Sequence, residues 1–281
     1  MLDRKHYVIL FLSGLLFVGC ARPKGIEPGI LKEMAGLDRL YVPALVFTDL
    51  GKQMESELAL ESYRRQWNKF YAKYHGRQIK YGLDITDKFW SEDFDRVNSL
   101  ILSAEALVKE RQLGEAHGDL DEVSKILKEL RHRHGLKYIL DALTEFHGYL
   151  DEISFLVEGG EDLREDDLLY LKQLFTAAQT SWAEIAQSEY DLKIFGFGPE
   201  KNEAIKGRVA EQEKFIEQLS AALSLADRDK IAQAASQLES NFILIIKAFG
   251  DFEPVFIRAR KGRGKLEISE KKLVSKEAVT K

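Results

Sequence analysis

The sequence predicts an all-α protein in which about six amphipathic helices form a helical bundle. Proline is scarce, with five residues in 281, whereas Leu, Ala, Glu and Lys, which favour helix, are abundant. From about residue 48 onward, apolar residues recur every three or four positions, which is the spacing of a helix with one buried face. No segment gives a convincing strand.

Each expected helix is bounded by residues that commonly begin or end helices. The first ends at His75-Gly76, because glycine often follows a helix. Asp119 can cap the third, Asp227 can cap the sixth, and Pro199 suits the first position of the fifth. The six expected helices span residues 48–74, 87 or 91 to 112, 120–157, 165–192, 199–225 and 227–249.

The spacing of large residues suggests an internal duplication. Met54 and Trp67 are thirteen residues apart in the first helix, as are Leu169 and Trp182 in the fourth. Two repeated three-helix units would explain this, although any six-helix chain offers such matches by chance. The expected organisation is a signal peptide at 1–19, a tether at 20–45, helical units at 46–160 and 161–256, and a basic disordered tail at 257–281.

The apolar face of the third expected helix changes at His134-Gly135. Before this point the apolar residues and His134 form one stripe, and after it they move to nearly the opposite side of the helix. The helix either breaks at Gly135, where glycine costs about 1 kcal/mol relative to alanine, or continues and contacts two different clusters. The sequence leaves both alternatives open.

Charge is distributed unevenly along the chain. From Arg258 to Lys281 there are nine Lys or Arg and three Glu, a net charge of +6, so residues 1–257 carry −11 of the total of −5. An acidic body is poorly suited to nucleic-acid binding, which requires a folded basic face. The basic tail either is a flexible solubilising end or contacts an anionic surface.

The first twenty residues have the pattern of a secretory signal. A short charged start precedes an apolar run from Tyr7 to Phe17, and small residues follow it. The run is shorter than the roughly 20 residues that a membrane-spanning helix needs. An ordinary cleaved signal or an uncleaved anchor would also give such a pattern.

The segment Leu16-Phe17-Val18-Gly19-Cys20 resembles the lipobox of bacterial lipoproteins, although Phe17 departs from its usual aliphatic residue. The resemblance implies that Cys20, the only cysteine, carries acyl chains such as palmitate and anchors a lipidated tether in a membrane. By resemblance to enterobacterial sorting signals, Ala21 after the cysteine favours the outer membrane, and the expected location is its periplasmic face. One acyl chain binds only marginally, at about 0.8 kcal/mol per buried methylene, whereas three chains hold firmly.

Two histidines are candidate ligands because each lies on an apolar stripe. His134 has Asp141 about two turns later, and His147 has Thr144 and Asp151 within one turn. These carboxylates could orient an imidazole that binds a divalent metal, but most histidines at such positions are simply buried and hydrogen-bonded. Glu129 and His132 form a single Glu-x-x-His, whereas carboxylate-bridged di-metal bundles need two.

A second local similarity concerns haem. The segments 48–56 and 127–134 are similar to parts of the soluble four-helix b-type cytochromes of the bacterial periplasm. The resemblance implies haem b held between Met54 and His134 as axial ligands. The alternative is that Met54 simply fills space in the core.

No catalytic constellation is visible. The chain lacks a phosphate-binding glycine-rich loop, Gly-x-Ser-x-Gly and His-Glu-x-x-His. The sequence therefore predicts a non-enzymatic, membrane-anchored helical module of the cell envelope that binds a protein partner or a small ligand, with no cofactor expected and no nucleic acid. The alternative is a haem or metal carrier.

Overall fold

The computed structural model describes residues 28–81, 85–158, 164–188, 190 and 192–262, and within these ranges the protein consists of helices, their connecting turns and one short pair of strands. The signal segment, Cys20, the start of the expected tether and residues 263–281 of the expected tail lie outside the described residues. The prediction of an all-α protein is confirmed.

Eight α-helices account for most of the described chain. They are α1 (Pro28–Asp49), α2 (Gln53–Tyr74), α3 (Trp90–Lys109), α4 (Leu113–Arg133), α5 (Ile139–Glu158), α6 (Glu165–Gln187), α7 (Pro199–Leu225) and α8 (Arg228–Phe249). A 3₁₀ turn, η1 (Leu192–Phe195), precedes α7, and a further helical segment covers 253–262. Strands β1 (Lys80–Tyr81) and β2 (Ile85–Thr86) pair antiparallel, Lys80 with Thr86 and Tyr81 with Ile85.

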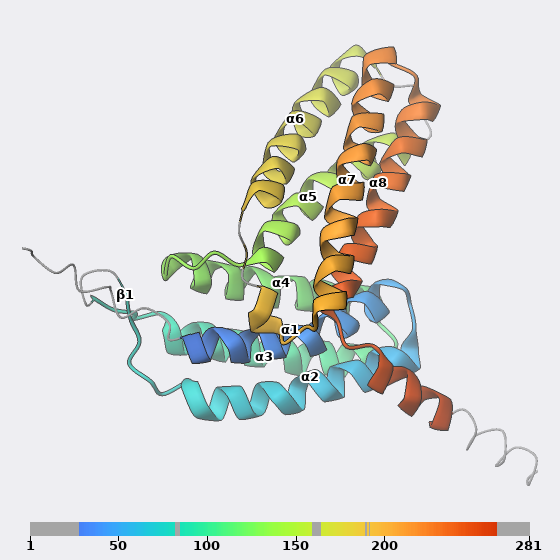
Figure 1. The fold of residues 1–281 in the computed structure, drawn as a ribbon. Helices are drawn as coiled ribbons and strands as arrows, with labels where there is room; N and C mark the ends of the chain where they lie inside the picture. Colours follow the sequence, from blue (N-terminus) through green and yellow to red (C-terminus); the bar gives the residue numbers. More distant parts are fainter. Residues whose placement is uncertain (1–27, 82–84, 159–163, 189, 191, 263–281) are drawn as a thin grey trace, which may run out of the picture.

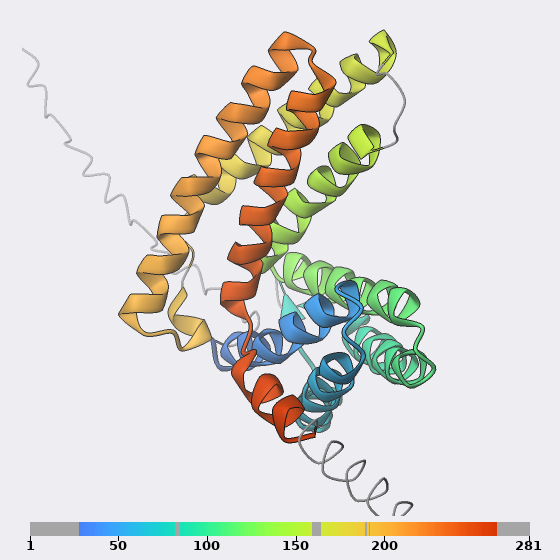
Figure 2. The ribbon, with the colours of Figure 1, turned by 90° about the vertical axis from the view of Figure 1, so that its right-hand side faces the viewer.

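The helices form two four-helix bundles, one of α1–α4 and one of α5–α8. In Figure 1 the helices of the second bundle rise steeply from the first, whose helices run across the view. Figure 2, turned by 90°, shows segment 253–262 returning alongside the first bundle. There Arg258 donates to the carbonyl oxygen of Leu58 and to Ser62 Oγ on α2.

The predicted count of six helices and the repeated three-helix units are not matched. The expected third helix is two helices, because α4 ends at Arg133 and α5 begins at Ile139. Gly135 has φ +65°, a left-handed conformation that glycine adopts readily, and its N–H donates to the carbonyl oxygen of His132. Of the two alternatives, the break at Gly135 is therefore the one observed.

The expectation of a tether over 20–45 is wrong from residue 28 onward, where α1 begins. The helix buries Ile30, Met34 and Leu37 at helical spacing, so its apolar face is part of the core. Pro43 lies within α1 and has no N–H to donate to the carbonyl oxygen of Arg39. The N–H of Asp251 donates to that oxygen instead at 2.8 Å, which ties the chain after α8 to α1.

Each bundle has an aromatic core. In the first, Trp67 contacts Phe94 at 5.4 Å between ring centroids, and in the second, Phe146 contacts Trp182 at 4.9 Å. All four side chains are buried. Among the residues that the structure describes, no helix is both long and apolar enough to cross a membrane.

Candidate functional site

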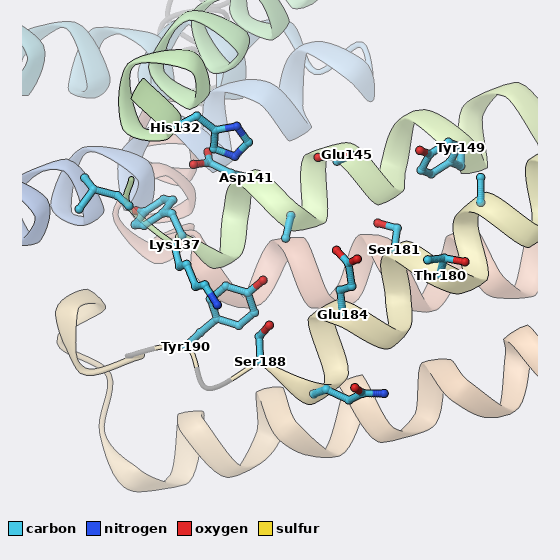
Figure 3. A pocket seen from close by; sticks show the side chains of 15 residues that line it. His132, Lys137, Asp141, Glu145, Tyr149, Thr180, Ser181, Glu184, Ser188 and Tyr190 are labelled. Atoms are coloured by element: carbon cyan, nitrogen blue, oxygen red, sulfur yellow. The ribbon is translucent and has the colours of Figure 1, made fainter. Parts of the chain in front are cut away.

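A polar groove lies between α5 and α6, beside the end of α4 (Figure 3), and has a volume of about 660 Å³. The groove lies next to the helix break at Gly135. After this break α5 runs in a different direction from α4 and packs against α6. We call this hollow the polar groove, and its lining comprises His132, Leu136, Lys137, Tyr138, Asp141, Ala142, Glu145, Tyr149, Ala177, Thr180, Ser181, Glu184, Gln187, Ser188 and Tyr190.

The two walls of the polar groove carry different groups. Figure 3 shows Thr180, Ser181 and Glu184 on α6, facing the side formed by the end of α4 and by α5. Lys137 and Glu145 lie on the α5 side, and Lys128 on α4 is 3.2 Å from Glu145. The groove therefore offers hydroxyl, carboxylate and ammonium groups together, which suits a polar ligand more than an apolar one.

A buried ion pair between Arg131 and Asp141 holds one side chain of the groove lining in place. Arg131, at the end of α4, donates from Nε to Asp141 Oδ2 at 2.8 Å and from Nη2 to the other carboxylate oxygen. Both side chains are less than 5% exposed. The guanidinium also lies over the ring of Tyr138, 4.4 Å from its centroid, and the Tyr138 hydroxyl donates to Asp38 on α1. The network therefore joins α1, α4 and α5.

Burial perturbs the titration of this network. It raises the pKa of Asp38 to about 6, and although Arg131 and the Tyr138 hydrogen bond oppose this effect, Asp141 adds to it. Burial also raises the pKa of Tyr138 well above its ordinary value, with Asp38 adding to the shift. Burial alone would lower the pKa of Arg131, but the attraction of Asp141 and Asp38 raises it overall.

The raised pKa of Asp38 predicts a pH-dependent stability. Below pH 3.8 the Asp38 carboxyl is protonated in both states, and the folded protein loses relative stability as the pH rises toward 6. We expect the free energy of unfolding, relative to that of Asp38→Asn, to increase by about 2–3 kcal/mol between pH 7.5 and pH 4. Urea unfolding of both proteins at several pH values measures this difference, and parallel pH profiles would contradict it.

His134 lies in a different cluster from Asp141, its expected partner. Its Nε2 is 2.8 Å from Asp87 Oδ2, and Arg133 Nε donates to the same oxygen at 3.1 Å. Asp87 also accepts from the N–H of Phe89, which turns the chain into α3. The interpretation of His134 as a buried, hydrogen-bonded side chain is thus the one that the geometry favours, and His134 and Asp141 are not brought together.

Met54 and His134 are at opposite ends of the first bundle. Met54 is the second residue of α2, whereas His134 packs on Trp90, whose indole N–H donates to the carbonyl oxygen of Tyr74 at the other end of α2. Twenty helical residues separate Met54 from Tyr74, about 30 Å. The haem ligation that the cytochrome resemblance implied therefore does not fit this fold.

His147 and Asp151 do lie together, as the sequence predicted. His147 Nε2 is 3.2 Å from Asp151 Oδ1, and the imidazole stacks on Phe242 with ring centroids 5.1 Å apart. This pair is far along α5 from Asp141. Among the described side chains, no group of three or more His, Cys, Asp or Glu residues is arranged to hold a metal ion.

A short repeat that the sequence analysis missed places another histidine–aspartate pair beside His147 and Asp151. Residues 113–127 on α4 and 143–157 on α5 are identical at eight of fifteen positions, including His-Gly-x-Leu-Asp-Glu. The equivalent pair is His117 and Asp121, with 3.5 Å between Nε2 and Oδ2. Comparing the chain with itself at an offset of thirty residues reveals this signal.

Comparisons of the chain with known protein families, with curated proteins and with solved structures found no match.

Proposed function

We propose that this protein is a lipid-anchored, non-enzymatic binding module of the cell envelope, which holds a polar segment of a protein partner in the polar groove. The observation that carries the binding role is the groove itself, whose walls offer hydroxyl, carboxylate and ammonium groups. The proposal requires no cofactor and no nucleic acid.

The lipobox-like segment ending at Cys20 supports the anchor. Acylation of Cys20 would hold the chain on a membrane, and Ala21 favours the periplasmic face of the outer membrane. Cys20 and Pro28, where α1 begins, are eight residues apart. A fully extended chain of this length spans at most about 29 Å. Under this proposal the first bundle would therefore lie close to the bilayer surface.

The pairing of two carboxylates in the polar groove supports binding in preference to catalysis. Asp141 is held by two hydrogen bonds from Arg131, and Glu145 is paired with Lys128, so these carboxylates are already engaged. Ser181 and Glu184 on α6 line the groove and can contact a ligand, whereas the Thr180 hydroxyl already donates to the carbonyl oxygen of Thr176 and can only accept. Such a surface recognises hydrogen-bonding groups of a partner without supplying an activated nucleophile.

A single cell-based experiment tests both parts of the proposal. A photo-crosslinking amino acid at Ser181, within the polar groove, should give a defined protein adduct after irradiation. The same amino acid at Ala183, exposed on another face of α6, should give none. In the same cells the protein should fractionate with the outer membrane, and Cys20→Ser should release it into the soluble fraction.

The two readouts fail independently. Equal crosslinking from Ser181 and Ala183 would contradict binding in the polar groove and leave the anchor standing. Retention of Cys20→Ser in the membrane fraction, or a bare thiol at Cys20 by mass spectrometry, would contradict the anchor and leave the groove standing.

A further inference from the structure

A second hollow, the inter-bundle cleft, lies where the two bundles meet and has a volume of about 250 Å³. Helices α1, α4, α5 and α8 all contribute to it. Its lining comprises Tyr41, Leu45, Val46, Asp49, Leu50, His117, Asp121, Ser124, Thr144, His147, Asp151, Glu239, Phe242, Ile243, Ile246 and Lys247.

The two repeated histidine–aspartate pairs converge on the inter-bundle cleft. One pair comes from α4 and the other from α5, so the duplicated segment supplies the same groups from two sides. His117 is held in place because its Nδ1 is 3.2 Å from the carbonyl oxygen of Leu45 on α1. The two copies of the segment thus face one hollow, although they belong to different bundles.

The inter-bundle cleft is negatively charged. Four carboxylates, those of Asp49, Asp121, Asp151 and Glu239, line it with a single lysine, Lys247. Burial raises the pKa of Asp151, and although His147 opposes this effect, Asp121 and Asp49 add to it. These carboxylates therefore repel one another across the cleft, and a bound cation would relieve that repulsion.

The rest of the lining is largely apolar. Leu45, Phe242 and Ile246 form an apolar surface next to the carboxylates, and Leu50 at the rim is about half exposed. A metal ion or an inorganic cation would leave this surface uncovered, whereas an organic cation with a hydrocarbon body would cover it.

A smaller cavity of about 40 Å³, the inner cavity, adjoins the cleft. The two share Tyr41, Leu45, Ser124, Thr144 and Ile246. Arg131 and Asp38 also line the inner cavity. Arg131 is 2% exposed, and its buried Nη1 has no hydrogen-bond partner among the described residues. A buried guanidinium nitrogen without an acceptor is costly, so this end requires an oxygen acceptor.

We infer that the inter-bundle cleft binds a small amphiphilic amine, with its ammonium group at Asp121 and Asp151 and an uncharged oxygen acceptor at Arg131 Nη1. Asp38 beside Arg131 disfavours an anionic acceptor. Asp121 and Arg131 are ten residues apart on α4, a rise of about 15 Å between their Cα atoms, which the two side chains and the two hydrogen bonds shorten. A ligand that reaches both groups therefore needs a spacer of several carbons, and a six-carbon amino alcohol is a suitable probe. The inference is independent of the polar groove.

Titration calorimetry with 6-amino-1-hexanol tests the assignment, using the full chain carrying Cys20→Ser at pH 7.5. We expect saturable binding that the double variant Asp121→Asn/Asp151→Asn weakens at least tenfold. The matched control is Glu122→Gln/Glu152→Gln, which removes the same charge from the next position of each repeat and does not line the cleft. The affinity of this control for 6-amino-1-hexanol should stay within twofold of that of the Cys20→Ser parent. Circular dichroism should show that both double variants are folded.

Three further titrations separate the alternatives. Hexylamine, which lacks the oxygen, and 1-hexanol, which lacks the charge, should each bind at least fivefold more weakly. Equal binding of 1-hexanol would show an unspecific apolar pocket, and equal binding of hexylamine would remove the role of Arg131. Either result overturns the proposal, as does saturable binding of ZnCl₂ without binding of the amino alcohol, which would make the pairs metal ligands.

Discussion

We expect Asp141→Ala to lower the free energy of unfolding by about 3–5 kcal/mol, because removing one partner of a buried ion pair leaves the other charge uncompensated. Arg131 is 2% exposed and donates hydrogen bonds from Nε and Nη2 to the carboxylate of Asp141. Denaturant unfolding followed by circular dichroism measures the change.

Two variants serve as controls for the buried pair. Asp151→Ala removes a carboxylate from the same helix that is partly exposed and forms an ion pair with His147, so it should cost less than about 1 kcal/mol. The double variant Arg131→Met/Asp141→Leu removes both charges and should recover much of the loss. A cost below about 1 kcal/mol for Asp141→Ala would contradict the role that we assign to this pair.

We expect Trp67→Ala to cost about 3–5 kcal/mol through the cavity that it creates in the first bundle. Trp67 is fully buried, and its ring contacts Phe70 and Phe94 at centroid distances of 5.9 and 5.4 Å. Its indole nitrogen has no hydrogen-bond partner among the described residues, so the stability that it provides comes from packing. Differential scanning calorimetry or urea unfolding measures the loss.

The conservative variant separates packing from hydrogen bonding at this position. Trp67→Phe keeps one aromatic ring and removes the unbonded N–H, so it should cost clearly less than Trp67→Ala. Phe155→Ala is the surface control, because Phe155 is 78% exposed, and it should change stability by less than about 0.5 kcal/mol. Equal losses for Trp67→Ala and Phe155→Ala would contradict the assignment of Trp67 to the core.

Local signals predicted helix ends well. The expected ends at Tyr74, Leu225 and Phe249 match α2, α7 and α8, because each end depends on residues within one turn of it. The start of α1 was not predicted, because a proline in a sequence usually indicates the end of a helix, and residues 20–45 contain three prolines. Pro43 is tolerated inside α1 because Asp251, more than 200 residues away, donates to the carbonyl oxygen that it leaves free.

The candidate sites depended on contacts that spacing cannot define. Periodicity placed His134 and Asp141 near each other along one helix, but the break at Gly135 separates them, and each takes a partner that the spacing did not indicate. The second histidine–aspartate pair could have been predicted from the sequence, because the segment that contains it is repeated thirty residues later. That both pairs face one cleft follows only from the way in which the two bundles meet.

The sequence by itself determined the all-helical class, the approximate positions of most helices and the change of apolar face at His134-Gly135, because these depend on short-range periodicity and on turn residues. The tertiary structure alone decided that the chain forms two bundles of four helices and that Arg131 pairs with Asp141. It also decided that the polar groove forms between α5 and α6 and that the inter-bundle cleft lies where the bundles meet. The physical reason is that a buried charge is costly unless it is paired with an opposite charge. Which partner is available depends on packing, and packing brings together residues that are far apart in the sequence.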